Sequence, residues 1–198
     1  MSERLWGVDW ARILPWTIGD VSVELSTFDE ILPFVKANAV ALFGDEDRRF
    51  FVEEMTGAKL RFWAECDVLA LRRGGELIGF WGGHPTDWST YYCRSMSILP
   101  EHREGNLATA LSTHIHELLV AHGVERVEVD TSIANVPMQR ILLRLGLVVT
   151  ATMSSERWGQ ILRFTKHFGE ESAQVFARQF INVPRYGKGT LNRERREP

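Results

Sequence analysis

The sequence predicts an α/β protein of the α+β type, in which a mixed, mostly antiparallel central sheet carries helices on both faces. Segments that alternate with a period of two and segments with helical periodicity follow one another along the chain. Three strands in the middle are separated only by short turns and loops, which favours antiparallel pairing. Helical segments stand before and after these strands, so both faces of one sheet can be covered.

Length and composition predict one domain. A chain of 198 residues with 44% hydrophobic content can bury a full core. We expect the domain to span residues 1–184, with an aromatic N-terminal arm that contains Trp6, Trp10 and Trp16. Residues 185–198 are rich in Arg and poor in apolar side chains, which predicts a mobile basic tail.

Charge and cysteine content exclude several classes of partner and compartment. The formal net charge of −3 gives no reason to expect a nucleic acid or an anionic membrane as partner. Two cysteines imply no disulfide framework and suit a reducing cytoplasm. The first ten residues lack the apolar region of a signal peptide, and no apolar run approaches the roughly 20 residues of a membrane span.

The first half of the sequence predicts a strand and two helices. Residues 20–26 alternate as a strand, and Thr27 with Glu30 matches the capping box of a following helix. Residues 45–55 have acids in the first turn and predict a second helix. The apolar stripe of the first helix comprises Ile31, Phe34, Val35 and Val40.

The remaining elements follow in a clear order. Gly74-Gly75 splits residues 67–82 into a hairpin, and residues 89–99 form the next strand. A helix runs from Leu107 until Gly123 stops it. The final elements are a strand over 126–132, a helix from Pro137 to Gly146, and an antiparallel pair over 147–154 and 160–168.

The turn over residues 103–108 joins a strand directly to a helix. The first amides of such a helix lack partners within it, and with the helix dipole they form an anion site suited to phosphate. Gly105, Asn106 and Ala108 would let a pyrophosphate approach the backbone, and Arg103 adds a charged donor. An ordinary strand–helix turn explains this stretch equally well, so the turn alone leaves both interpretations open.

The wider pattern resembles the GNAT family of acyl-CoA N-acyltransferases over residues 21–168. That family marks its pyrophosphate loop with [Gln/Arg]-x-x-Gly-x-[Gly/Ala] after a strand. Here Arg103 and Ala108 match, while Asn106 replaces the central glycine. Asparagine tolerates the left-handed backbone region better than most residues, and Gly105 adds freedom.

A second motif supports the resemblance. In the family, Asn-x-Pro opens a short helix that ends in Leu-Gly-Phe. Asn135, Pro137, Leu145 and Gly146 match this pattern in order and spacing, with Leu147 in place of the aromatic residue.

The resemblance implies acetyl-CoA or another acyl-CoA as co-substrate, with no metal. The pantetheine arm would lie where the strand before the loop and the strand over 126–132 separate, and a backbone amide at Ile98 or Leu99 would stabilise the oxyanion. The implied cofactor-binding residues are Ile98, Leu99, Arg103, Glu104, Gly105, Asn106, Leu107, Ala108 and Asn135.

Asp130 is the first candidate for the base that accepts the amine proton. Side-chain alternation places Glu128 and Asp130 on one face of their strand, which suggests that this face lines a wet groove. The resemblance supports this role, since ribosomal-protein alanine acetyltransferases of the family place a carboxylate base here. The alternative is an exposed or salt-bridged acid without a catalytic role.

Three other side chains are weaker catalytic candidates. Many family members place a thiolate-protonating tyrosine where this chain has Leu142, so Tyr92 is considered as the acid instead, at a position where other members keep a glutamate base. His84, in a loop between two central strands, could enter the acceptor site. Cys93 could act as a covalent relay, although no histidine stands beside it in sequence.

The seven tryptophans allow two interpretations. Trp81, Trp88, Tyr91 and Tyr92 gather on one hairpin, where they could form core or an aromatic pocket for the acceptor or acyl group.

The predicted function is transfer of an acetyl or other acyl group from coenzyme A to the amine of a small molecule. The alternatives are a longer-chain or carrier-protein-dependent acyltransferase, and a catalytically silent GNAT fold used for binding. A homodimer and an acyl carrier protein stay open as partners.

Overall fold

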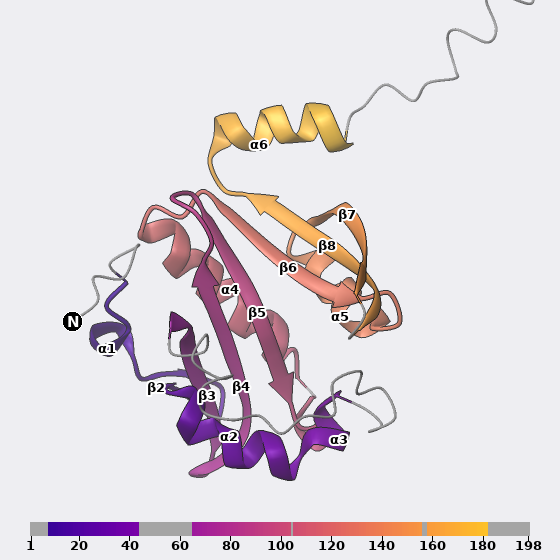
Figure 1. Ribbon diagram of the computed structural model, residues 1–198. Helices are drawn as coiled ribbons and strands as arrows, with labels where there is room; N and C mark the ends of the chain where they lie inside the picture. The colour runs from indigo at the N-terminus through magenta and orange to yellow at the C-terminus, as the bar shows by residue number, and fades with distance from the viewer. Residues whose placement is uncertain (1–7, 44–64, 104, 156–157, 182–198) are drawn as a thin grey trace, which may run out of the picture.

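The computed structural model describes residues 8–43, 65–103, 105–155 and 158–181. They form an eight-stranded sheet in the order β1-β2-β3-β4-β5-β6-β8-β7 (Figure 1). Neighbouring strands are antiparallel except β5 and β6, which are parallel. The predicted mixed, mostly antiparallel sheet is therefore confirmed.

The strands agree closely with the predicted segments, apart from one addition and one longer strand. The strand predicted to end at Gly82 continues to Pro85, so His84, predicted in a loop, lies on a strand. Trp16–Ile18 forms a short strand that the sequence did not predict, because three residues are too few to show alternation. It pairs with the next strand across the turn at Gly19. The strands are β1 Trp16–Ile18, β2 Val21–Ser26, β3 Asp67–Arg73, β4 Glu76–Pro85, β5 Thr90–Ile98, β6 Arg126–Ser132, β7 Val148–Ser155 and β8 Gly159–His167.

The helices show one confirmed cap and one wrong boundary. The capping box of Thr27 and Glu30 is present. The helix that it opens ends at Ala37, and Val40, predicted on its apolar stripe, lies on the next helix and is 55% exposed. The helix predicted over 45–55 lies outside the described residues. The helices are α1 Trp10–Ile13, α2 Phe28–Ala37, α3 Ala39–Phe43, α4 Leu107–Ala121, α5 Val136–Arg144 and α6 Glu170–Phe176.

Helices cover both faces of the sheet, as predicted (Figure 1). On one face, Leu111, Ile115 and Leu119 of α4 pack in a core with Val127 and other buried strand residues. On the other face, α2 packs against β3 and β4 in a separate, smaller core. None of the described helices is long and apolar enough to span a membrane.

The aromatic residues near the sheet are mostly core. The Trp10 ring lies 6.2 Å from that of Trp81, which in turn stacks on Tyr91 at 6.0 Å, and all three are buried. Trp88 is 85% exposed, and Trp6 lies outside the described residues. These contacts favour the core interpretation over the aromatic acceptor pocket.

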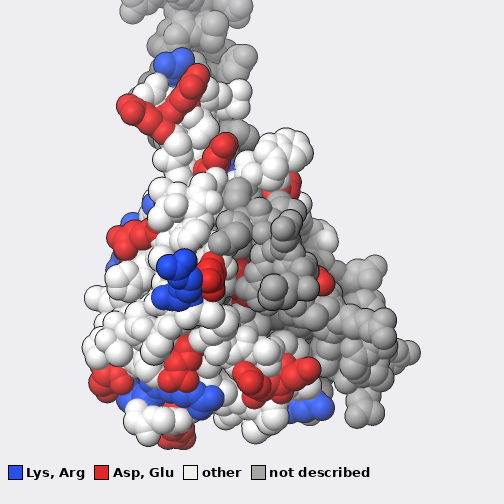
Figure 2. Space-filling view, turned by 90° about the vertical axis from the view of Figure 1, so that its left-hand side faces the viewer, with Lys and Arg blue, Asp and Glu red and all other residues white. Residues whose placement is uncertain are grey.

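Surface charge is mixed in sign. The side of the molecule that is on the left in Figure 1 carries acidic and basic side chains close together (Figure 2). This mixture agrees with the small net charge of the sequence, −3.

The strands β5 and β6 separate after a short parallel contact. Thr90–Tyr92 pairs with Arg126–Glu128, and beyond these residues the two strands diverge (Figure 1). β6 continues to pair with β8 as far as Ser132. The ladder between β5 and β6 therefore ends inside the sheet, at the position that the family resemblance implies, and we call the divergence of the two strands the β5–β6 split.

His116 is a buried histidine on α4. Its ring packs edge-on against Phe168 at 5.5 Å, and its Nδ1 has no hydrogen-bond partner among the described residues. Burial lowers the pKa of His116 to about 4, with a further contribution from the positive charge of Lys166. The unfolded chain, with a pKa near 6.5 at this residue, binds the proton more readily.

We therefore expect acid to destabilise the fold through His116. The contribution of the neutral ring is fully present above about pH 6.5 and is lost as the pH falls towards 4, on the order of 3 kcal/mol in total. Denaturant unfolding of wild type and His116→Leu across this range measures it. The variant should lose less stability on acidification, and equal losses in both proteins would contradict the expectation.

Candidate active site

The turn before α4 has the backbone that an anion site requires. Gly105 and Asn106 both adopt the left-handed conformation, with φ of 72° and 63°. Asparagine thus takes this conformation at the position where the motif expects glycine. Its side chain makes no capping bond to α4, and a Cβ at Gly105 would meet nothing within 4 Å. The backbone at the mouth of α4 is therefore open, while Glu104 lies outside the described residues.

The Arg103 side chain turns back onto the protein. Its Nε donates to the Ile98 carbonyl at 2.8 Å, and its Nη2 donates to the Ala41 carbonyl at 3.3 Å. The guanidinium thus joins the end of β5 to α3. To reach a phosphate at the turn, Arg103 has to exchange these two acceptors for the ligand.

The two candidate oxyanion donors at the end of β5 differ in availability. The Leu99 amide donates to the Ile78 carbonyl at 2.9 Å. Hydrogen-bonded and non-bonded pairs alternate along antiparallel strands, so Ile98, opposite Gly79, points its N–H and C=O away from β4. The Ile98 amide is therefore the remaining candidate for the oxyanion donor, and it faces the side of β5 where β6 lies.

The second motif builds the ends of α5. The Asn135 Oδ1 accepts from the Met138 amide at 3.2 Å, so this side chain caps the helix. At the other end, Gly146 is left-handed and Lys166 donates to the Leu145 carbonyl at 2.7 Å. Leu142 is 2% exposed and belongs to the core, and its apolar side chain offers no proton at the position where many family members place a tyrosine.

Side chains alternate along β6 as predicted. Val127, Val129 and Thr131 are buried on the face that α4 covers, and Glu128 and Asp130 lie on the other face. The two carboxylates are largely enclosed, with side chains 15% and 14% exposed. An enclosed carboxylate needs a charged or hydrogen-bonding partner.

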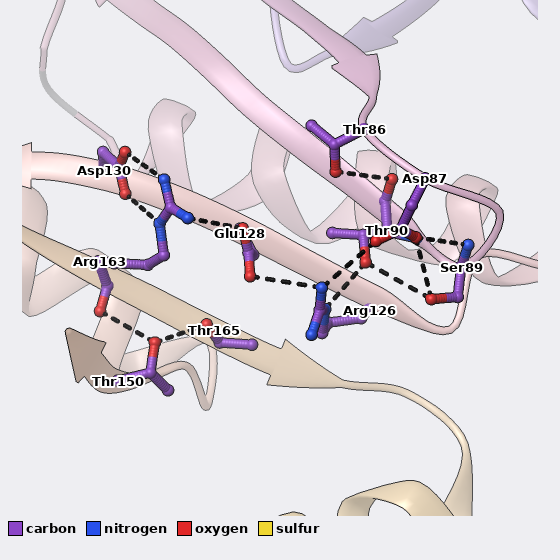
Figure 3. Close-up of polar contacts among 10 residues, drawn as sticks. All are labelled: Thr86, Asp87, Ser89, Thr90, Arg126, Glu128, Asp130, Thr150, Arg163 and Thr165. Atoms are coloured by element: carbon purple, nitrogen blue, oxygen red, sulfur yellow. Dashed lines mark hydrogen bonds and ion pairs between the residues drawn. The ribbon is translucent and has the colours of Figure 1, made fainter.

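Arg163 of β8 supplies that partner to Asp130. Its Nε donates to Oδ1 at 2.8 Å and its Nη2 donates to Oδ2 at 2.9 Å, a bidentate ion pair (Figure 3). The Tyr92 hydroxyl also donates to Oδ2, at 3.1 Å. Asp130 is thus a salt-bridged acid, and it is also bonded to a second catalytic candidate.

The ion pairs continue along the face as a row. Glu128 lies 3.2 Å from Arg163 and 3.6 Å from Arg126, which lies 3.5 Å from Asp87 (Figure 3). Neither arginine was among the predicted site residues. Alternation in β8 could have placed Arg163 on a strand face, but the pairing of β8 with β6 decides which acid it meets.

Tyr92 and His84 lie next to this row. The two residues are opposite each other on β5 and β4, with rings 5.6 Å apart. Burial, then the charge and hydrogen bond of Asp130, raise the pKa of Tyr92 to about 12. His84 Nδ1 lies 3.1 Å from the Pro85 carbonyl, which can only accept, so Nδ1 carries the proton. The neutral ring then keeps Nε2 as a proton acceptor.

Cys93 does not share this face. It is 9% exposed and belongs to the same core cluster as Tyr91. Burial raises the pKa of its thiol to about 12. A covalent relay needs an accessible thiolate, so the geometry argues against that role.

A hollow of about 810 Å³ adjoins the row of ion pairs. Arg126, Glu128 and His167 line its floor, and α6 forms a wall through residues such as Phe176. The Phe176 ring lies 4.6 Å from that of His167. This open hollow begins at Glu128, two residues along β6 from Asp130, and lies on the face of β6 that carries both carboxylates, which we call the acid face.

The chain matches one family model over most of the domain. The Acetyltransferase (GNAT) family model matches residues 36–147, more than half of the chain. No curated protein sequence matches significantly.

Solved structures share the fold at low identity. A GNAT family acetyltransferase from Elizabethkingia anophelis with acetyl-CoA bound is 8% identical, with a TM-score of 0.57 over 76% of this chain and 100% of that chain. A ribosomal-protein alanine acetyltransferase from Vibrio fischeri is 11% identical, with a TM-score of 0.60 over 79% and 98%. A Bacillus subtilis acetyltransferase in complex with CoA is 12% identical, with a TM-score of 0.55 over 74% and 98%. At these identities the likeness shows the fold alone.

The coupling between Tyr92 and Asp130 can be measured by titration. In Asp130→Asn, the pKa of Tyr92 should fall from about 12 part of the way towards 10, because the negative charge is lost while burial remains. Phenolate absorbance against pH gives the value, with Asp130→Asn/Tyr92→Phe subtracting the other tyrosines. An unchanged Tyr92 titration would show that the two side chains do not interact in solution.

Proposed function

The chain belongs to the GNAT acetyltransferase family, and from this premise we propose that it transfers an acetyl group from acetyl-CoA to the amine of a small molecule. The observation that carries the proposal is the β5–β6 split. An open helix mouth lies at one end of it, and the face with Asp130, Tyr92 and His84 lies along it. Donor and acceptor can thus meet from opposite sides.

Coenzyme A is held by backbone groups in this proposal. Its pyrophosphate binds over residues 103–108, where the α4 amides and the helix dipole favour an anion. The pantetheine arm enters the split and takes over the Ile98 carbonyl, which Arg103 otherwise occupies. The released guanidinium then reaches the phosphates, and the Ile98 amide stabilises the oxyanion of the tetrahedral intermediate.

The acid face supplies the acceptor chemistry. Asp130 accepts a hydrogen bond from the incoming amine and holds it in the split. Because Arg163 bonds to both oxygens of the Asp130 carboxylate, we assign Asp130 the orientation of the amine and not the final uptake of its proton. His84 takes the proton at Nε2, which stays free as an acceptor because Nδ1–H bonds to the Pro85 carbonyl. Tyr92 keeps its proton throughout and fixes Asp130.

The hollow beside Glu128 supports a small-molecule acceptor. We propose that the body of the acceptor lies beside Glu128, between β6, β8 and α6. We further propose that the protein acts in the cytoplasm, since the buried thiol of Cys93 suits a reducing compartment.

The first test is coenzyme A binding by calorimetry. Asn106→Gly should bind as well as wild type or better, since glycine adopts the left-handed conformation more readily. Ala108→Leu, with its larger side chain at the helix mouth, should weaken binding at least roughly tenfold. A wild-type protein that binds no coenzyme A would favour a carrier-protein donor or a silent binding fold.

The second test divides the proton transfer between two residues. A positioned acid or base is worth roughly 10²–10⁴-fold, so His84→Gln should lower kcat by this order. Asp130→Asn should also raise KM for the amine, while coenzyme A affinity stays near wild type. Release of free thiol from acetyl-CoA across a panel of primary amines measures both.

Two outcomes would contradict these roles of His84 and Tyr92 in the proton transfer. A His84→Gln enzyme with wild-type turnover, beside an inactive Asp130→Asn enzyme, would give the proton to Asp130. A descending alkaline limb that disappears in Tyr92→Phe would make Tyr92 the acid that protonates the thiolate.

A further inference from the structure

Arg163 lies close to three side chains of the candidate site, those of Asp130, Glu128 and Tyr92. It lies directly opposite Asp130 in the β6–β8 register. Two of its nitrogens bind Asp130, the third lies 3.2 Å from Glu128, and its guanidinium carbon lies 5.9 Å from the centre of the Tyr92 ring. One residue therefore bonds to both carboxylates of β6 and lies near the Tyr92 ring.

The two oxygens of the Asp130 carboxylate accept different numbers of hydrogen bonds. Each carboxylate oxygen offers two lone-pair positions. Oδ2 accepts from both Arg163 Nη2 and the Tyr92 hydroxyl, so both of its positions are used. Oδ1 accepts from Arg163 Nε, and among the described residues no second donor reaches it. One acceptor position of the carboxylate thus stays available.

Arg163 also reduces the repulsion between the two carboxylates of this face. Glu128 and Asp130 are two residues apart on the same side of β6, so their charges repel. A planar guanidinium that binds one carboxylate through two parallel bonds sets its plane as well as its charge. Lysine supplies the charge alone.

We propose that Arg163 is a positioning residue for acyl transfer: it fixes the Asp130 carboxylate so that Oδ1 presents its one unused lone pair to the acceptor amine. This inference rests on the proposed function. It assigns the amine to Oδ1 and gives Arg163 a role in orientation beyond neutralising charge.

The kinetic test separates charge from geometry. In Arg163→Met, kcat/KM for the fastest amine of the panel should fall roughly 10²-fold, the loss expected when a reacting group is misplaced by about 1 Å. Arg163→Lys should recover only part of this loss, and KM for acetyl-CoA should stay near wild type in both. Guanidinium ion added to Arg163→Ala should restore activity, whereas ammonium ion should not.

A matched control is available in the same sheet. Arg72 of β3 also forms an ion pair, with Glu24 at 3.2 Å, and its side chain is 35% exposed against 32% for Arg163. Arg72→Lys should leave kcat/KM unchanged. Wild-type kcat/KM in Arg163→Lys, or rescue by ammonium as effective as by guanidinium, would overturn the proposal.

An NMR measurement tests the hydrogen bonds between Arg163 and Asp130 without enzyme turnover. In proton–nitrogen NMR spectra, the Arg163 Nε–H, assigned by its loss in Arg163→Lys, should exchange with water several-fold faster in Asp130→Asn than in wild type. Equal exchange rates in both proteins would refute the proposal that Arg163 holds the Asp130 carboxylate. A wild-type protein that acetylates no amine in the panel would refute the proposed function, whatever the NMR result.

Discussion

The separation of β5 and β6 is the constraint on which the rest of the structure depends. The two strands pair over only three residues each and then diverge, although both remain in one sheet. Backbone N–H and C=O groups beyond this point, such as those of Ile98, need partners other than a neighbouring strand. Arg103 supplies one of them to the Ile98 carbonyl. An interrupted ladder inside a sheet is costly to leave unsatisfied, and this is a reason to regard it as a ligand site.

On the acid face of β6, enclosed charges rather than backbone groups need partners. Enclosed carboxylates are stable only when cations and hydrogen-bond donors surround them. Arg126 and Arg163 lie between the acids of the row, and Tyr92 completes the set at Asp130. Such a network is rigid because each member has more than one partner. A rigid polar face suits a reaction in which an amine must be held at a fixed angle to a thioester.

Short-range patterns carried most of the correct predictions. The capping box at Thr27, the left-handed Asn106, the Asn135 cap and the alternation along β6 all depend on neighbours within a few positions. The same rule explains the failures. α1 and β1 are too short to display a period, and Val40 fell outside α2 because the helix ends at Ala37. Cys93 and Tyr92 are adjacent in sequence, yet strand geometry sends them to opposite faces.

The sequence by itself determined the order of the elements from β3 to β8, the loop before α4, and which residues share a face of β6. These properties follow from local periodicity and spacing, which any segment carries with it. Only the tertiary structure decided that Arg163, 33 residues from Asp130, is its partner, and that His84, Tyr92 and Asp130 lie together. The physical reason is register. A shift of β8 by one residue along β6 would turn Arg163 to the other face, and no local pattern in either strand specifies that alignment.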